Sequence, residues 1–143
     1  NCNSAVLNKN AILALGPRVV PLGMRFYTGN MFPTDFTNAI FIAERGSGTS
    51  ISDRIGFRIV AVKLNETTGL PMDHKIFAYG WEVGNDIING RPVDVSILND
   101  GSLLISDDDD NAIYRITYNG DKSKTFFNYT NNNNNCDYSY VLD

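Results

Sequence analysis

The apolar positions of this chain occur in short runs separated by clusters of Gly, Asn, Asp and Pro. The runs are rich in Val, Ile, Phe and Tyr, which is typical of strands and not of helices. We therefore predict an all-β fold with two groups of strands. The first group is predicted at Leu22–Tyr27, Ala39–Glu44, Phe57–Leu64 and Lys75–Tyr79, and the second at Pro92–Leu98, Ser102–Ser106, Ala112–Tyr118 and Thr125–Tyr129.

Alternation is clearest in Phe57–Leu64, where apolar residues flank the cationic Arg58 and Lys63. This pattern predicts a strand with one wetter face. Two segments predict tight turns: Leu98–Gly101 contains Asp-Gly, which tolerates the positive φ of a hairpin, and Asn65–Gly69 plays the same part in the first group.

The two groups resemble each other, since residues 38–44 parallel 101–107 and residues 56–62 parallel 112–118. A repeat of about 60 residues with variable loops is compatible with a four-stranded propeller blade. We predict two antiparallel four-stranded blades of a propeller-type fold within residues 15–130, at about 15–80 and 90–130. Residues 1–14 form an N-terminal segment, and residues 131–143 form an Asn-rich and Tyr-rich tail that could add an edge strand.

Composition and charge exclude several partners. The 143 residues, 43% of them hydrophobic, suffice for one compact domain. The net charge of −4 comes from 12 basic and 16 acidic residues with no basic run, which argues against nucleic-acid binding. No apolar stretch is long enough to predict a membrane span.

Several features of the sequence predict an extracellular protein. The chain begins with Asn1, so we expect a mature product or a fragment. Sequons at Asn65 and Asn128 predict N-linked glycans. Cys2 and Cys136 either pair, stabilising the fold by roughly 4–5 kcal/mol through loop closure, or stay free or bond between chains. Together these features predict secretion.

A series of motifs lies in order between Leu15 and Tyr118: Pro21–Tyr27, Phe32-Pro33, Ile40–Glu44, Arg45–Ser47, Gly56–Arg58, Gly90–Val95, Asp100–Leu104, Ser106–Asp108 and Ile113–Ile116. In order and spacing they resemble the C-terminal part of the glucose/sorbosone dehydrogenase family, which includes pyranose dehydrogenases that use pyrroloquinoline quinone (PQQ). The resemblance implies a six-bladed propeller holding PQQ and Ca²⁺ in its channel, with a catalytic histidine on an earlier blade. Two blades are too few to close such a ring.

This chain differs from the family at positions that the resemblance places near the quinone site. Where the family has His-Gly-Ser-Trp-Asn-Arg, this chain has Arg45 followed by Gly-Ser-Gly-Thr-Ser, and Arg18 stands where relatives often have His. Arg for His replaces a group that titrates near neutral pH with a fixed cation. Arg91 is retained. The resemblance thus implies Arg91, Arg45 and Arg18 as candidate quinone-binding cations, with no catalytic residue assigned.

Three further features have ordinary explanations beside functional ones. His74, the single histidine, is expected in a surface turn and not as a base. Asp107–Asp110 is expected to be a solvated turn, although four carboxylates could collect Ca²⁺. Trp81 is expected to seal a blade edge, although it could stack on a sugar.

Three alternative functions are compatible with these features of the sequence. The first is a non-catalytic, secreted structural module that self-associates into a closed ring or a filament, because open sheet faces and edges must be covered. The second is a fragment of a PQQ-dependent sugar dehydrogenase, in which case the isolated chain is expected to be inactive. The third is a glycan-binding module using Trp81 and the Tyr-rich tail.

Overall fold

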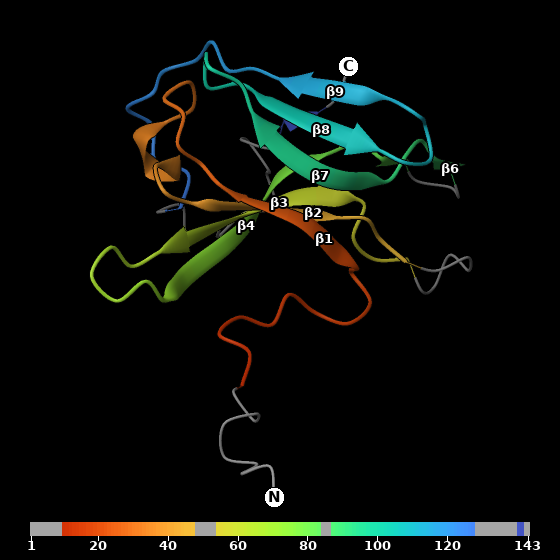
Figure 1. Cartoon of the computed structure of the whole chain (residues 1–143), viewed down its shortest axis with the longest axis horizontal. Helices are drawn as coiled ribbons and strands as arrows, with labels where there is room; N and C mark the ends of the chain where they lie inside the picture. The colour runs from red at the N-terminus through yellow and green to blue at the C-terminus, as the bar shows by residue number, and fades with distance from the viewer. Residues whose placement is uncertain (1–9, 48–53, 84–86, 128–139, 142–143) are drawn as a thin grey trace, which may run out of the picture.

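Two β-sheets lie face to face, and the main core fills the space between them (Figure 1). The computed structural model describes residues 10–47, 54–83, 87–127 and 140–141. Within these residues the first sheet has the strand order β1-β2-β3-β4-β10 and the second sheet the order β7-β8-β9, with β5 and β6 forming a small separate ribbon. The all-β, antiparallel fold class is confirmed.

The strands and one short 3₁₀ helix have the following bounds. They are β1 (Pro21–Phe26), η2 (Thr34–Phe36), β2 (Ile40–Glu44), β3 (Arg58–Leu64), β4 (Pro71–Tyr79), β5 (Glu82–Val83), β6 (Ile87–Ile88), β7 (Pro92–Ile97), β8 (Leu103–Asp107), β9 (Ile113–Ile116) and β10 (Tyr140–Val141). The tail thus supplies an edge strand, since β10 pairs with the outer edge of β4 in parallel.

Both predicted turns join neighbouring antiparallel strands. Gly101 has a φ of +87° and its N–H donates to the carbonyl of Leu98 at 2.9 Å, which closes the turn between β7 and β8. Gly69 has a φ of +68° in the turn between β3 and β4, where its N–H donates to the carbonyl of Asn65. The Asn65 carboxamide oxygen accepts the N–H groups of Thr67 and Thr68, which stabilises this turn.

The core between the sheets is rich in aromatic rings. The ring of Phe36 on η2 lies 5.7 Å from Phe41 of β2 and 5.3 Å from Phe77 of β4, measured between ring centroids. The second sheet contributes the buried Leu103 and Ile105 to the same cluster. The alternating residues of both sheets therefore meet in one core, as strand geometry requires.

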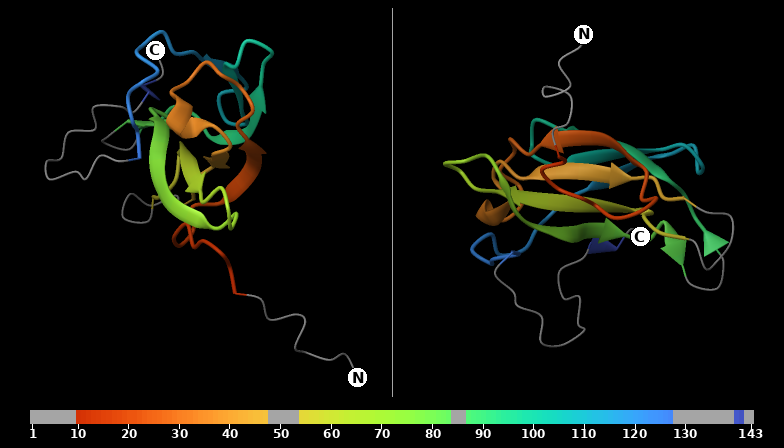
Figure 2. Two further views of the ribbon diagram at one scale, coloured as in Figure 1. Left: turned by 90° about the vertical axis from the view of Figure 1, so that its left-hand side faces the viewer. Right: turned by 90° about the horizontal axis from the view of Figure 1, so that it is seen from below.

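β3 is buried on both faces, so the predicted wetter face is wrong. Ile59 and Ala61 belong to the core between the sheets, and Val60 and Val62 belong to a second cluster on the opposite face. That face is partly covered by the segment of residues 10–20, which crosses the strands of the first sheet in Figure 2. The cover comes from a segment distant in sequence and without a strand pattern, so alternation within β3 could not reveal it.

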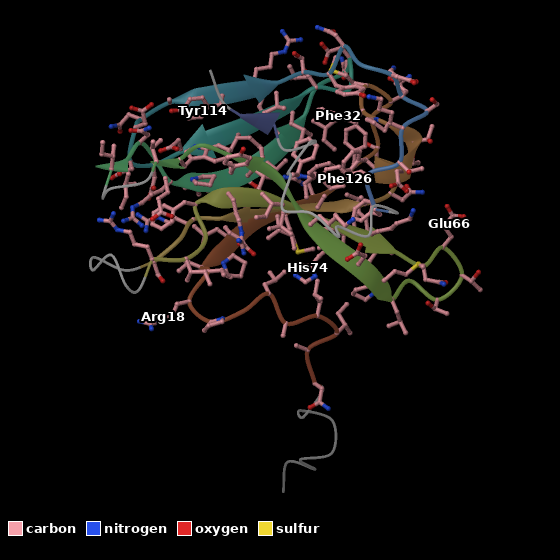
Figure 3. All side chains as sticks on the ribbon, turned by 180° about the vertical axis from the view of Figure 1, so that it is seen from behind. Arg18, Phe32, Glu66, His74, Tyr114 and Phe126 are labelled. Carbon is pink, nitrogen blue, oxygen red and sulfur yellow. The ribbon has the colours of Figure 1, made fainter. Side chains whose placement is uncertain are left out.

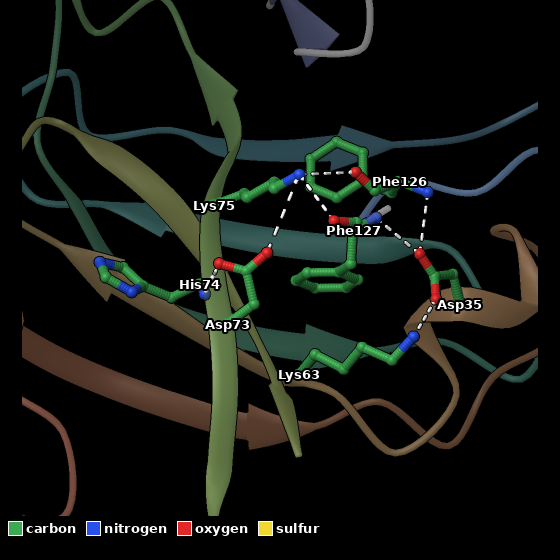
Figure 4. A network of polar contacts seen from close by, with 7 residues as sticks. All are labelled: Asp35, Lys63, Asp73, His74, Lys75, Phe126 and Phe127. Atoms are coloured by element: carbon green, nitrogen blue, oxygen red, sulfur yellow. Dashed lines mark hydrogen bonds and ion pairs between the residues drawn. The ribbon is translucent and has the colours of Figure 1, made fainter. Parts of the chain in front are cut away.

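The strand predicted at Thr125–Tyr129 is not a strand over residues 125–127. Here the backbone is held by side chains of the first sheet and η2. The carboxylate of Asp35 accepts the N–H groups of Phe126 and Phe127 at 2.8 and 2.6 Å, and the Lys75 ammonium donates to both carbonyls (Figure 4). These polar groups are therefore satisfied without pairing to β9.

We call this arrangement of Asp35, Lys63, Lys75, Phe126 and Phe127 the latch. Lys63 forms an ion pair with Asp35 and lies 5.5 Å from the centroid of the Phe127 ring. Burial of Asp35 opposes its ionisation, but Lys63 and the two backbone N–H groups outweigh burial and lower its pKa below 3.8. The latch fixes residues 126 and 127 to the first sheet and to η2.

Candidate functional site

The structure brings two of the three candidate arginines together at one corner. Arg45 follows β2, Arg91 precedes β7, and the acidic turn Asp107–Asp110 begins at the end of β8. The Arg91 Nη1 donates to the carbonyl of Gly46 at 3.2 Å, and the N–H of Asp108 donates to the carbonyl of Arg91 at 3.3 Å. The ends of both sheets are thus tied together at the arginine corner, meaning Arg45, Arg91 and this turn.

Close packing at the corner requires glycine. Gly46 has a φ of +81°, and a Cβ added there would lie 2.6 Å from the ring of Phe57. The same ring lies beneath the Arg91 guanidinium, whose Cζ is 4.9 Å from the ring centroid. Phe57 itself has a φ of +54°, an unfavourable conformation for an aromatic residue. The position of Arg91 is therefore fixed by packing as well as by charge.

The charges of both arginines already have carboxylate partners. The Arg45 Nη2 and Nε atoms lie 2.8 and 2.9 Å from Oδ2 of Asp108. The Arg91 Nε lies 4.0 Å from Oδ2 of Asp109. Arg18 is exposed, and it precedes Val19 and Val20, whose carbonyls accept the N–H groups of residues 46 and 45. Arg18 therefore lies on the segment that borders the corner.

The acidic turn is organised mainly by hydrogen bonds within it. Asp107 Oδ1 accepts the N–H groups of Asp109 and Asp110 at 3.0 and 2.8 Å. The Tyr114 hydroxyl donates to Asp110 Oδ2 at 2.5 Å, and this hydrogen bond, with burial and the nearby negative charge, raises the pKa of Tyr114 to about 12. Asp108, Asp109 and Asp110 are exposed, as expected of a solvated turn, but Asp107 is buried at 6% exposure, and its Oδ2 has no hydrogen-bond partner among the described residues. In the described part of the chain, no group of three or more His, Cys, Asp and Glu side chains is placed to hold a metal ion.

A buried carboxylate lies next to the corner. Glu44 at the end of β2 is 0% exposed, and its Oε2 accepts a hydrogen bond from Arg58 Nε at 2.6 Å. Burial raises the pKa of Glu44, and Arg58 only partly offsets that effect. The buried Oε1 has no hydrogen-bond partner among the residues described. The Glu44 side chain is buried, whereas the Arg58 side chain is 26% exposed.

These contacts do not fit PQQ and Ca²⁺ bound by the described residues alone. The resemblance implies arginines that bind the quinone carboxylates, but Arg45 and Arg91 are paired with Asp108 and Asp109. An anionic cofactor would have to displace those carboxylates or accept their repulsion. We therefore derive no chemical step through the quinone at this corner.

Trp81 and His74 have the non-catalytic environments that the sequence favoured. Trp81 is 1% exposed and its ring packs edge-on against Tyr114 with centroids 5.9 Å apart, so it has no open face for a sugar. His74 is exposed, but it lies within β4 and not in a turn before it, because β4 begins at Pro71 and is longer than predicted. Figure 3 shows His74 on the side of the first sheet that the N-terminal segment crosses.

The face of the first sheet that points away from the second is apolar and incompletely covered. Strand register aligns two rows across β1 to β4, because directly opposed residues share a face. The rows are Met24, Ile42, Val60 and Ile76, and Phe26, Ile40, Val62 and His74. Leu13 and Leu15 cover the centre, whereas Met24, Phe26 and Ile76 at the two sides are 53%, 52% and 39% exposed. We call these rows the apolar outer face.

The opposite side of the molecule, the outward surface of the second sheet, is mainly polar. Register places Asp94, Ser106 and Ile113 in one row and Ser96, Leu104 and Arg115 in the other. Arg115 forms an ion pair with Asp100, and its Nε donates to the hydroxyl of Ser102. We call these rows the polar outer face.

Sequence reasoning missed both the latch and the apolar outer face. The Phe126-Phe127 pair was a signal of burial, but nothing local marked Asp35 as its partner, 91 residues away from Phe126. The apolar outer face follows from the register of four strands. Asn128, Cys2 and Cys136 lie outside the described residues.

Comparison with known proteins shows the fold. In its holo form, the PQQ domain of pyranose dehydrogenase from Coprinopsis cinerea superposes with a TM-score of 0.53 and 21% sequence identity, covering 71% of this chain and 27% of that one. At this identity the likeness concerns architecture alone. The two sheets therefore have the fold of part of a PQQ-dehydrogenase-like β-propeller.

The sequence comparisons add one relative whose function is also open. An uncharacterized protein of Borreliella burgdorferi is 40% identical over 108 residues, which span 76% of this chain and 28% of the relative. No family model matches the sequence. This chain spans about a quarter of the length of both proteins, 28% of the relative and 27% of the solved chain.

Proposed function

We propose that this chain is a non-catalytic structural module of a propeller-type assembly, in which another β-sheet covers the apolar outer face. The proposal is supported above all by the exposure of Met24, Phe26 and Ile76 beside a buried apolar centre. Soluble proteins rarely leave contiguous apolar surface open, and such surface marks interaction sites. Propellers cover their sheet faces by packing them on neighbouring sheets.

The arginine corner supports the non-catalytic part of the proposal. Its arginines are paired with aspartates, and among the described residues His74, the single histidine, is exposed far from them in sequence. The wider setting is also part of the proposal: secretion, glycans on Asn65 and Asn128, and a bond between Cys2 and Cys136. Among the described residues, no helix is long and apolar enough to cross a membrane.

Light scattering on the purified chain, combined with intact mass spectrometry, tests this proposal. We expect a particle mass that is a multiple of the mass of one chain, of which the polypeptide contributes 15.9 kDa, and that rises with concentration. Titration with PQQ and Ca²⁺, followed by the quinone absorbance, is expected to show no saturable binding. A chain that stays monomeric at every concentration would contradict the self-association.

A second candidate is a part of a quinone-dependent sugar dehydrogenase. The likeness to the PQQ domain of pyranose dehydrogenase favours it, as does the small share of both relatives that this chain spans. In that case further chain would cover the apolar outer face and supply the catalytic base, and Arg91, Arg45 and Arg18 would contribute cations at the edge of the quinone site. Saturable PQQ binding that is weakened by Arg91→Ala would favour this candidate.

The third candidate, a glycan-binding module, loses its main residue. Trp81 is buried against Tyr114 and cannot stack on a sugar without unfolding the ribbon around it. We therefore retain the structural module as the favoured function.

A further inference from the structure

The sequence contains two Asn-Gly pairs, Asn89-Gly90 and Asn119-Gly120. Because glycine has no Cβ, its backbone nitrogen can approach the side-chain carbonyl carbon of the preceding asparagine more closely than the nitrogen of any other residue can. We propose that Asn119 is a site of spontaneous deamidation in the folded protein, and that packing protects Asn89 from the same reaction. This inference concerns a covalent modification and does not depend on the proposed function.

Deamidation at an Asn-Gly pair needs no enzyme and no reactant except water. The backbone nitrogen of Gly120 loses its proton to the solvent and attacks Cγ of Asn119. The new N–Cγ bond closes a five-membered succinimide ring, the Cγ–Nδ2 bond breaks, and the amide nitrogen takes up a proton and leaves as ammonia. Water then opens the ring at either carbonyl, which leaves aspartate or isoaspartate at position 119. The main chain must therefore rotate at the asparagine until the nitrogen and Cγ meet.

The surroundings of Asn119 permit this rotation. Asn119 and Gly120 are exposed and lie beyond the end of β9 at Ile116, outside any strand. Within the ranges that the structure describes, neither residue of the pair takes part in a hydrogen bond. Rotation at Asn119 thus breaks no hydrogen bond of the pair itself, and exposed segments of this kind open at a low free-energy cost.

Packing requires glycine at position 120. A Cβ added there would lie 2.5 Å from the hydroxyl oxygen of Tyr118. The same hydroxyl donates to the carbonyl of Asp121 at 2.9 Å, so the Tyr118 side chain spans the turn. A larger residue at position 120 would therefore collide with Tyr118, whereas the neighbouring Asn119 stays exposed to solvent. The turn thus keeps a reactive Asn-Gly pair at the surface.

Asn89 carries the same motif in a different environment. Its N–H donates to the carbonyl of Trp81 at 2.7 Å, and the following Gly90 is buried. A Cβ added to Gly90 would overlap Oδ2 of Asp107 and lie 2.9 Å from Cδ1 of Trp81, so these side chains enclose the glycine. Rotation at Asn89 would move Gly90 against them. The Asp107 carboxylate also disfavours the negative charge that the Gly90 nitrogen must acquire before it attacks.

Peptide mapping of the full chain in its folded state tests this inference. The protein is incubated at mildly alkaline pH, and samples taken over time are digested and sequenced by mass spectrometry. Conversion of the amide to a carboxyl group gives a small mass gain, and aspartate and isoaspartate peptides separate on chromatography. We expect deamidation at Asn119 to be at least about tenfold faster than at Asn89, because packed structure must open first only at Asn89.

Unfolding the chain in urea supplies the reference rates. There both pairs should react at rates within about threefold of each other, because packing no longer distinguishes them. Asn119→Gln should abolish the fast reaction of the folded chain, since the longer side chain would have to close a less favourable six-membered ring. Asn89→Gln is the matched control and should leave the rate at Asn119 unchanged. Circular dichroism verifies that both variants fold.

Two results would overturn the inference. The first is an unreacted Asn119 in the folded chain after a time in which the unfolded chain deamidates at that position. The second is an equal rate at Asn119 and Asn89 in the folded chain, which would show that the packing around Gly90 gives no protection.

Discussion

The two outer faces of this molecule are built on the same strand geometry but end in opposite chemistry. In the first sheet, register aligns Met24 with Ile76 across a buried centre of Ile42 and Val60. In the second sheet, it aligns Asp94 with Ser106 and Ile113. The outward face of the first sheet is apolar, like a protein interior. The outward face of the second sheet is mainly polar, like an ordinary protein surface.

The two outer faces differ in how far contacts within the chain cover or pair their side chains. The polar outer face is satisfied by water and by local pairs such as Arg115 with Asp100. The apolar outer face is covered only in part, by Leu13 and Leu15. A fold made of two stacked sheets has two outward faces, and in this chain one of them exposes a row of apolar side chains while the other is mainly polar.

The strongest test of this contrast places the same charge on each face. Val60→Asp puts a carboxylate at a position that is 1% exposed, and it is expected to lower the free energy of unfolding by more than about 3 kcal/mol, because a buried charge has no partner there. Ser96→Asp on the polar outer face is the matched control and should change it by less than about 0.5 kcal/mol. Urea unfolding measures both; similar losses would contradict the contrast.

A smaller effect on stability is expected from changes in the latch, whose residues belong to neither outer face. Asp35→Asn removes the ion pair with Lys63 and weakens two hydrogen bonds, so we expect a loss of about 2 kcal/mol in the free energy of unfolding. Asp73→Asn, at an exposed carboxylate 3.8 Å from Lys75, is the control and should cost less than about 0.5 kcal/mol. The oligomeric state should be the same in both variants as in the wild type, and a change in it would show that the latch and the outer faces are coupled.

Asp35 also predicts how the free energy of unfolding depends on pH. Because the folded pKa of Asp35 lies below its usual 3.8, ionised Asp35 stabilises the fold above that pH, and the stabilisation is lost as the pH falls through the folded pKa. The free energy of unfolding of the wild type should therefore fall below about pH 4 more steeply than that of Asp35→Asn. Parallel curves for the two proteins would show that Asp35 makes no such contribution.

The smallest expected effect concerns the segment that covers the apolar outer face. Replacing Leu13 and Leu15 by Ala should cost about 1 kcal/mol for each residue, since both are only partly buried, and should increase binding of the dye ANS. Ile12→Ala in the same segment should leave the unfolding energy of the monomer within about 0.5 kcal/mol. If all three substitutions behave alike, the segment does not pack as described.

The sequence by itself determined most of the strands and both of the predicted turns of this protein. Short runs of β-branched and aromatic residues formed β1, β2, β3, β7, β8 and β9 close to their predicted bounds. Gly69 and Gly101 formed the expected turns, because positive φ is a local property that a residue type can signal. The exposed part of the acidic turn, Asp108–Asp110, and the burial of Trp81 also agreed with the expectations from sequence, whereas the burial of Asp107 did not.

Only the tertiary structure decided which faces are covered and which side chains meet. Arg45 and Arg91 are brought together with Asp108 and Asp109 from three separate segments, so their pairing could not be read from spacing. Likewise, the N–H groups of residues 126 and 127 donate to the Asp35 carboxylate and not to a neighbouring strand, so the strand predicted there does not form at these residues. Burial of β3 on both faces depends on Leu13 and Leu15, because burial arises from contacts between segments and not from the pattern within one.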